Sequence, residues 1–395
     1  MTLHEPAVMP TYGRFPLTLV RGAGTRVWDD SGREFLDMAG ALGVTAIGHS
    51  HPAWVEAITT QATTLDMVSN LYATEPQARL AERLAALLPI PDAQVFFANS
   101  GAEANEAAIK LARKHGLASG RPTIVALEGS FHGRTLAALA ATGQPAKREP
   151  FEPLVDWFRF VPPGDLGALE SAMTADVGAV FLEPVMGEGG VLPMSDDYLR
   201  GVRAACDDRG AMLIADEVQS GMGRCGDWLA ISRSGVVPDV VTLAKALGGG
   251  LPIGALVARA DLAFGPGEHA STFGGGPIVC AGALAVLDVI ETGGLLARAD
   301  AIGDLLSRTV RGVADDALVT DVRGRGCLWG IQLDRPVAHD VALAMLEAGV
   351  LVSIAGPDVV RMSPPLVATD DEILHAVAAF VDALRRVAQT QGSPA

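Results

Sequence analysis

A single lysine ends an apolar run in the segment DVVTLAKALGGG. Residues 240–244, VVTLA, have the composition of a buried strand, and Lys245 follows them directly before a cluster of glycines. One interpretation is that Lys245 is simply the first solvated residue after the strand. The other is that it is a buried amine that can attack a carbonyl group and hold it covalently. Lys245 alone does not decide between the two.

Two carboxylates, Asp216 and Glu217, follow another apolar run, AMLIA at 211–215. Open α/β sheets bind ligands at the carboxyl ends of their strands, so a carboxylate there is a candidate ligand-binding group. A buried aspartate needs a cationic or protonated partner, because an unpaired charge is costly in the interior. The alternative is a pair of solvated acids at the end of a strand, and the sequence leaves both open.

A phosphate site is predicted where the strand 94–98 leads into a helix. Ser100 followed three residues later by Glu103 fits a capping box, which predicts a helix that begins near Gly101. The free N–H groups of such a helix bind anions, and the small Gly101 and Ala102 let a phosphate approach. The alternative is a capped helix with nothing bound.

The loop GSFHGRT, residues 129–135, follows the strand candidate 123–127. The ring of Phe131 can stack on a planar cofactor, and the guanidinium of Arg134 suits a carboxylate. His132 is interpreted as a residue that only fills a turn. The loop therefore contributes one aromatic and one cationic candidate to the same sheet edge.

A glycine pattern offers a rival class of enzyme. Gly221, Gly223 and Gly226 spell G-x-G-x-x-G, the dinucleotide fingerprint, but residues 216–220 separate them from the preceding strand. In the fingerprint the glycines form the first turn after the strand, so we interpret this match as accidental. An NAD-dependent dehydrogenase stays as one alternative, and a non-catalytic binding protein on the same scaffold as another.

The elements that must position these residues alternate along the chain. Helix candidates at 76–88 and 102–116 lie among the strand candidates, which predicts an α/β fold with a mostly parallel sheet covered on both faces. We expect residues 59–277 to form this large domain. Residues 1–58 and 278–395 are expected to form a smaller α+β domain from both chain ends. The strand candidates are 94–98, 123–127, 178–183, 211–215, 240–244 and 254–258.

Composition excludes several kinds of partner. The 395 residues include 30 basic and 46 acidic side chains, a formal net charge of −16, which opposes binding to nucleic acid or to anionic membranes. The four cysteines are scattered, which favours reduced thiols and no metal site. The sequence has no apolar run of membrane-spanning length and no apolar signal core at its start, so a cytoplasmic protein is expected.

A lysine, an aspartate, an aromatic ring and a phosphate site at one sheet edge together meet the requirements of pyridoxal 5′-phosphate. A lysine holds the aldehyde of this cofactor as a Schiff base. A carboxylate keeps its pyridine nitrogen protonated, so that the ring can accept electrons.

Seven segments in order resemble the class III aminotransferases, and within that family most closely its acetylornithine-specific members. The resemblance covers nearly the whole chain. It implies the fold type I architecture of pyridoxal-phosphate enzymes and a homodimer with active sites at the subunit interface. The segments are FFANSGAEANEAAIKLARK, FHGRTLAALAATGQP, FLEPVMGEGGV, DEVQSGMGR, TLAKALGGGLPIGA, STFGG and VVRMSPPLV.

The resemblance also implies roles around the cofactor ring. Lys245 would be the Schiff-base lysine, and Asp216 would pair with the pyridine nitrogen. Val218 would pack on one face of the ring and Phe131 on the other, with Gln219 near the ring hydroxyl.

Further implied roles concern the phosphate and the substrates. Gly101 and Ala102 would bind the phosphate together with Thr272 from the partner subunit. Arg134 would hold a substrate carboxylate, with Ser271 beside it.

Glu183 and Arg361 resemble the switch pair of the family, in which the glutamate masks the arginine until 2-oxoglutarate arrives. Three positions depart from the usual residues: Met186 stands in place of Gln, and Gly276 and Ser353 stand in place of Asn. They leave the implied cofactor set intact.

The implied reaction moves the distal amine of N-acetylornithine, or of a close analogue, to 2-oxoglutarate. The products are a semialdehyde and glutamate, as in arginine biosynthesis. Succinylornithine, ornithine, 4-aminobutyrate and a lysine-pathway substrate are the alternative donors. Arg134 would set the substrate length by binding the far carboxylate.

Overall fold

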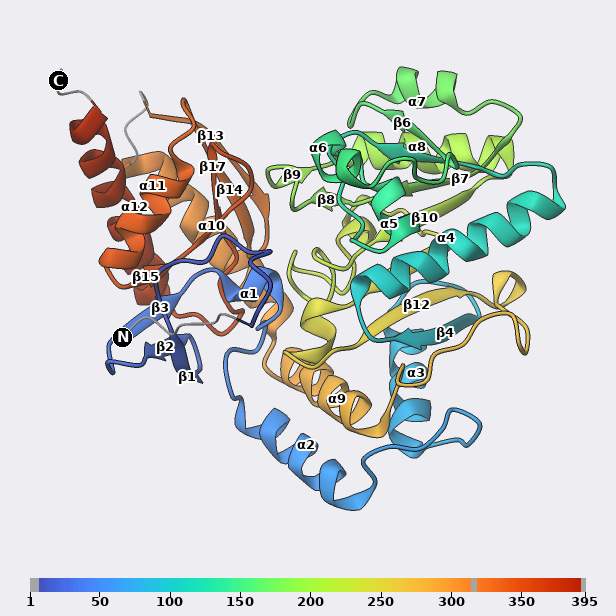
Figure 1. The fold of residues 1–395 in the computed structure, drawn as a ribbon, viewed down its shortest axis with the longest axis horizontal. Coiled ribbons are helices and arrows are strands. Elements are labelled where there is room, and N and C mark those ends of the chain that lie inside the picture. The colour runs from blue at the N-terminus through green and yellow to red at the C-terminus, as the bar shows by residue number, and fades with distance from the viewer. Residues whose placement is uncertain (1–6, 314–317, 392–395) are drawn as a thin grey trace.

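A computed structural model describes residues 7–313 and 318–391 of the chain. Its centre is a seven-stranded sheet, mostly parallel as the sequence predicts (Figure 1). β10 is parallel to β7 and β11, and β5 is parallel to β7 and β6, whereas β12 is antiparallel to its neighbours. In sheet order the strands are β4 (Ala93–Ala98), β12 (Gly254–Arg259), β11 (Val240–Leu243), β10 (Met212–Asp216), β7 (Val177–Leu182), β5 (Thr123–Leu127) and β6 (Phe158–Val161).

Both faces of this sheet are buried under helices, which explains why its strands are almost continuously apolar. Along β7, Val180 and Leu182 belong to the core beneath α8 and α9, whereas Ala179 and Phe181 belong to the core beneath α4 and α5. The helices around this sheet are α3 (Glu75–Leu87), α4 (Gly101–Ala118), α5 (Leu136–Ala141), α7 (Leu166–Ala172), α8 (Asp196–Arg209) and α9 (Pro277–Thr292).

Strands from both chain ends share a smaller sheet, because β15 (Val350–Leu351) pairs with β3 (Glu34–Asp37). β1 (Leu19–Ala23) and β2 (Arg26–Asp29) complete it. The predicted domain limits at 58 and 277 stay a prediction. A second small sheet and three helices lie beside it (Figure 1): β13 (Val319–Arg325), β14 (Leu328–Leu333), β17 (Val359–Met362), β16 (Ser353–Ile354), α10 (Leu295–Val313), α11 (Ala338–Glu347) and α12 (Asp370–Gln391).

Shorter elements connect these parts, and α2 packs along α9. The helical ones are α1 (Gly40–Gly43), α2 (Pro52–Thr64), α6 (Pro145–Arg148) and the 3₁₀ turns η1 (Glu149–Phe151), η2 (Ala230–Ser234), η3 (Lys245–Gly248) and η4 (Ala260–Leu262). The remaining strands are β8 (Val185–Met186) and β9 (Leu192–Pro193).

In the described part of the chain, no single helix has the length and hydrophobicity of a membrane span. The bent pair formed by α9 and residues 295–312 of α10 meets that test by length and composition alone.

The sheet topology brings the candidate residues to one edge. β4 and β11 point the same way, because each is antiparallel to β12, which lies between them. The segments after β4, β5, β7, β10 and β11 therefore leave the sheet at the same edge, and these segments contain the candidates from Ser100 to Lys245.

Candidate functional site

A cavity of about 470 Å³ opens at this edge of the sheet, and Lys245 lines it. Lys245 begins η3 with a φ of 43°, in the left-handed region that side chains rarely adopt. Within residues 7–313 and 318–391 its amine takes part in no ion pair. Burial lowers the pKa of Lys245 below its usual value, although Glu188 opposes the shift. This is the environment of a reactive amine.

Asp216 lies on the same cavity at the end of β10, and its carboxylate is held by three donors. Oδ2 accepts hydrogen bonds from Asn105 Nδ2 and from the ring nitrogen Nδ1 of His132, both at 2.8 Å, and Oδ1 accepts one from the Val218 N–H at 3.0 Å. These bonds fix a buried carboxylate in one orientation at the cavity wall.

A second layer of contacts holds those donors. Asn105 accepts a hydrogen bond from Thr242 Oγ1 at 2.6 Å and donates one to the His132 carbonyl, also at 2.6 Å. The His132 ring stacks on Phe181, with centroids 3.9 Å apart. The interpretation of His132 as a turn filler is therefore wrong, because its ring orients Asp216.

The neighbouring acid Glu217 lies outside the cavity. It is buried, and it accepts hydrogen bonds from the Ser220 hydroxyl and from the Ile231 N–H. Burial raises the pKa of Glu217 to about 7. The two consecutive carboxylates of the sequence thus have different environments.

Ser100 caps α4 as predicted, but Glu103 binds the N–H of the residue before the cap and not that of Ser100 itself. Ser100 Oγ accepts a hydrogen bond from the Glu103 N–H at 3.2 Å, and the Glu103 carboxylate accepts one from the Asn99 N–H at 2.6 Å. Gly101 and Ala102 line the cavity. A Cβ atom at Gly101 would lie 2.6 Å from the Val218 side chain, so only glycine allows this close approach.

Phe131, Val218 and Gln219 also line the cavity. Gln219 donates a hydrogen bond through Nε2 to the Leu42 carbonyl at 3.1 Å, which ties it to α1. Arg134 lies at the same cavity, with its guanidinium 5.6 Å from the centre of the Phe131 ring.

The acidic partner of Arg361 is Glu188 and not Glu183, so the predicted pairing is wrong. Arg361 Nη1 lies 2.6 Å from Glu188 Oε1 and donates to the Gly187 carbonyl at 3.0 Å, and its Nε donates to Ser353 Oγ at 3.0 Å. The departure at Ser353 thus supplies a ligand to the arginine.

Glu183 lines the cavity but binds backbone groups. Its carboxylate accepts hydrogen bonds from the N–H groups of Phe131 at 2.8 Å and of Gly187 at 3.3 Å. Burial raises the pKa of Glu183 to about 7. Glu183 therefore links the loop of Phe131 to the turn that carries Glu188, and its role toward substrate stays a prediction.

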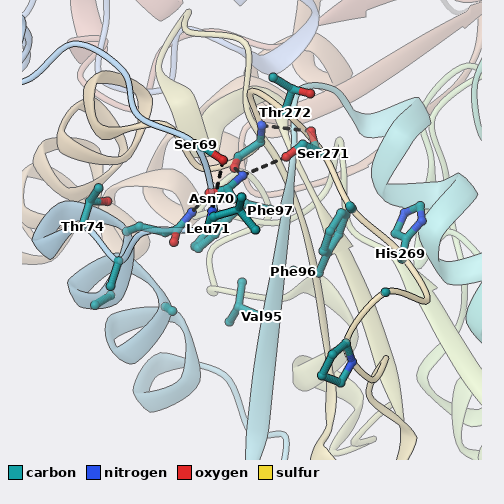
Figure 2. Close-up of a pocket in the computed structure, with 18 residues that line it drawn as sticks. Ser69, Asn70, Leu71, Thr74, Val95, Phe96, Phe97, His269, Ser271 and Thr272 are labelled. Carbon is teal, nitrogen blue, oxygen red and sulfur yellow. Dashed lines mark hydrogen bonds between the residues drawn. The ribbon is translucent and has the colours of Figure 1, made fainter.

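Ser271 and Thr272 line a different, larger pocket of about 770 Å³, bounded by α3, β4 and the segment before α9 (Figure 2). Ser271 accepts a hydrogen bond from Asn99 Nδ2 at 3.3 Å, and Asn99 lines the cavity of Lys245, so Ser271 lies at the border between the two. Thr272 is exposed and does not line the cavity of Lys245 in its own chain.

Comparison with known sequences decides the family. The sequence pattern of the class III aminotransferases matches residues 7–384, nearly the whole described chain. The chain is a class III aminotransferase. Acetylornithine aminotransferase of Mycolicibacterium smegmatis is 49% identical to it over 389 residues, which cover 98% of this chain and 97% of the relative.

Two solved structures support the same assignment. Ornithine aminotransferase from Toxoplasma gondii superposes with a TM-score of 0.94 at 31% identity, covering 98% of this aminotransferase and 94% of its own chain. N-acetylornithine aminotransferase from Stenotrophomonas maltophilia gives a TM-score of 0.83 at 36% identity, covering 95% and 97%. The architecture of this chain is therefore fold type I.

The cofactor of this aminotransferase is pyridoxal 5′-phosphate. The cavity fits this cofactor, because it is lined by the Lys245 amine, by the fixed carboxylate of Asp216 and by Gly101. Gly101 is the first residue of α4 and has no side chain to block a phosphate. The residues that would hold it are those predicted from the sequence, and their individual roles stay predictions: Gly101, Ala102, Phe131, Asp216, Val218, Gln219, Lys245 and, from the partner subunit, Thr272.

The rival interpretations lose their support. Gly221, Gly223 and Gly226 lie in turns that lead to the 3₁₀ turn η2, whereas a dinucleotide fingerprint requires an α-helix after its glycines. The aminotransferase assignment also replaces the non-catalytic scaffold, since Lys245 and Asp216 share one cavity.

His132 offers the first prediction. In a His132→Asn variant, Asp216 loses a buried donor and a stacked ring, so we expect kcat to fall about tenfold. Measurement of kcat across pH 6 to 9 checks this. Loss of the His132 hydrogen bond should also change how readily the Asp216 carboxylate takes up a proton, and so shift the pH profile of kcat. A variant with unchanged kcat and profile would show that Asn105 and Val218 suffice to orient Asp216.

Glu188 offers the second prediction. Burial would raise the pKa of Glu188, but Arg361, together with Lys245 and Lys147, holds the pKa below its usual value. The ion pair therefore persists at neutral pH and breaks only as pH falls. In Glu188→Gln, Arg361 is free for a carboxylate. We expect activity with glutamate as amine donor to rise about tenfold relative to monocarboxylate donors. Steady-state kinetics with both donors measures this ratio, with the surface variant Glu347→Gln as control. An unchanged ratio would contradict the gating role.

Proposed function

We propose that this aminotransferase moves the distal amine of N-acetylornithine to 2-oxoglutarate and yields a semialdehyde and glutamate. The observation that carries the proposal is that Lys245, Arg134 and Glu188 line one cavity, with Arg361 paired to Glu188 behind it. The names of the similar enzymes from M. smegmatis and S. maltophilia support this donor. The reaction would serve arginine biosynthesis, and the cytoplasmic location stays a prediction.

The first half-reaction depends on two residues of the sheet edge. Bound pyridoxal phosphate supplies an electron sink for the electrons left when the substrate carbon loses its proton. Lys245, with its lowered pKa, would accept that proton and deliver it to C4′, the aldehyde carbon of the cofactor. Asp216 would keep a proton on the ring nitrogen, because its carboxylate is buried and fixed by three donors.

The two substrates differ in their number of carboxylates. N-acetylornithine has one, which Arg134 would bind while Glu188 neutralises Arg361. 2-Oxoglutarate has two, and its second carboxylate would displace Glu188 from Arg361. One site could thus accept both substrates in turn without an unpaired buried arginine.

Steady-state kinetics with a panel of donors tests the proposal. We expect kcat/KM for N-acetylornithine to exceed that for ornithine and 4-aminobutyrate at least about tenfold. Succinylornithine is included to measure tolerance of the acyl group. A higher kcat/KM for ornithine or 4-aminobutyrate would contradict N-acetylornithine as the donor while keeping the chemistry.

The homodimer also belongs to this proposal. Beside the pocket of about 770 Å³ lie large apolar side chains that are widely exposed in one chain, Leu71 at 89% and Phe273 at 66%. A second copy would cover them and bring Thr272 to its phosphate site. We expect Phe273→Glu to give monomers in light scattering and to weaken cofactor binding. Unchanged dimers, or a monomeric wild type, would contradict this.

A further inference from the structure

Lys147 is a cation beside the cofactor cavity, and no motif in the sequence indicates a role for it. It lies in α6, and its Nζ stands 4.6 Å from the centre of the Phe131 ring. Arg134 approaches the same ring, at 5.6 Å. In the described part of the chain, neither cation forms an ion pair. Two cations without carboxylate partners therefore flank the aromatic ring of the site.

The nearby acids do not neutralise this pair. Glu188 is engaged by Arg361, and Glu183 by the backbone N–H groups of Phe131 and Gly187. Burial lowers the pKa of Lys147, Glu188 opposes that shift, and the neighbouring Arg134 adds to it, so all these groups share one electrostatic environment. This end of the site is suited to anionic groups.

One arginine is sufficient to bind one carboxylate, because its fork makes two parallel hydrogen bonds. The additional cation acts on the group beside that carboxylate. In ornithine the carbon next to the carboxylate bears an ammonium group, whereas in N-acylated ornithine the same nitrogen is an uncharged amide. A second cation at this end repels the former and tolerates the latter.

We propose that Lys147 is a specificity-determining residue, which selects N-acylated amino donors by repelling a free α-ammonium group. This inference rests on the proposed function, in which Arg134 binds the donor carboxylate. Lys147 would thus discriminate between acylated and free donors by charge, in addition to any steric fit of the acyl group. The chemical class selected is a monocarboxylate with a neutral α-nitrogen and a distal amine.

Donor kinetics of Lys147→Gln test the proposal. We expect the ratio of kcat/KM for N-acetylornithine to that for ornithine to fall at least about tenfold, mainly through a gain with ornithine. Lys147→Arg keeps the charge and is expected to keep the ratio. Arg148→Gln is the matched control, since Arg148 lies over Phe160, a ring that does not line the cofactor cavity, whereas Lys147 lies over Phe131, which does.

Binding measurements give a readout without turnover. Calorimetry on the enzyme loaded with pyridoxamine phosphate, which does not condense with amines, compares Nα-acetylnorvaline with norvaline. Wild type is expected to bind the acetylated compound more tightly, and Lys147→Gln to reduce that preference at least about tenfold.

Equal losses with both donors in Lys147→Gln, or an unchanged ratio, would overturn the proposal and leave Lys147 a packing residue on Phe131. A wild type that prefers ornithine would instead refute the proposed function. The norvaline comparison still tests Lys147 in that case, because it depends only on charge beside the carboxylate.

Discussion

Replacement of Lys245 by alanine is expected to lower the transamination rate by about 10⁴-fold or more. Lys245 is the amine that lines the cavity, its pKa is lowered by burial, and its strained φ of 43° shows that the fold holds it there. In the proposed mechanism, this variant lacks both the covalent anchor of the cofactor and the group that moves the proton. Rates with saturating donor and 2-oxoglutarate measure the loss.

Two controls make this result specific to the amine. Circular dichroism and thermal unfolding verify that Lys245→Ala folds, and Lys110→Ala removes a lysine from the exposed side of α4, where it contacts His269. We expect the control variant to keep at least half of the wild-type rate. A folded Lys245→Ala enzyme within tenfold of wild type would show that another group performs the chemistry.

The second large effect is expected in Asp216→Asn, with a fall in kcat of about 10³-fold. An asparagine has no negative charge to hold a proton on the cofactor nitrogen. Its amide also faces the donors Asn105 and His132, which need an acceptor. Stopped-flow measurement of the donor half-reaction separates this loss from effects on 2-oxoglutarate binding.

The adjacent acid gives a matched control. Glu217 is buried to the same extent, but its partners are Ser220 and Ile231 and it does not line the cavity. We expect Glu217→Gln to stay within a few-fold of wild-type kcat. Similar losses in both variants would indicate a structural cause, and a mild Asp216→Asn phenotype would contradict the assigned role of Asp216.

The sequence predicted the scaffold well because local signals agreed with the fold. The predicted strand 123–127 is β5, and Ser100 caps α4, which begins at Gly101 as expected. Apolar runs of five or six residues between amphipathic segments have few alternatives to buried strands of a covered sheet. The convergence of Asp216 and Lys245 at one edge then follows from topology.

The arginine switch could not be predicted with the same certainty. The turn EPVMGEGG contains two glutamates, and sequence alone does not show which one reaches Arg361 across 173 residues or more. Glu183 directly follows β7, and its carboxylate accepts hydrogen bonds from nearby backbone N–H groups, whereas Glu188 lies further along the turn and pairs with Arg361. The presence of Glu188 five residues after Glu183 was the one feature of the sequence that could have indicated the alternative pairing.

Tertiary contacts also explain the missed roles of His132 and Lys147. His132 follows Phe131 in the loop and gives no pattern of its own, yet stacking on Phe181 turns its ring toward Asp216. Lys147 lies thirteen residues beyond Arg134, and only the packing of α6 brings both onto Phe131. Neither contact follows a periodic pattern in the sequence, so neither could be predicted from it.

The visible absorption spectrum of the purified protein, before and after addition of N-acetylornithine without any keto acid, tests the central claim most directly. We expect a yellow band from lysine-bound pyridoxal phosphate. N-Acetylornithine should bleach this band in preference to ornithine or 4-aminobutyrate, and 2-oxoglutarate should restore it. A protein that stays colourless after incubation with pyridoxal phosphate would contradict the assigned role of Lys245, and a band bleached only by another donor would contradict N-acetylornithine as the substrate.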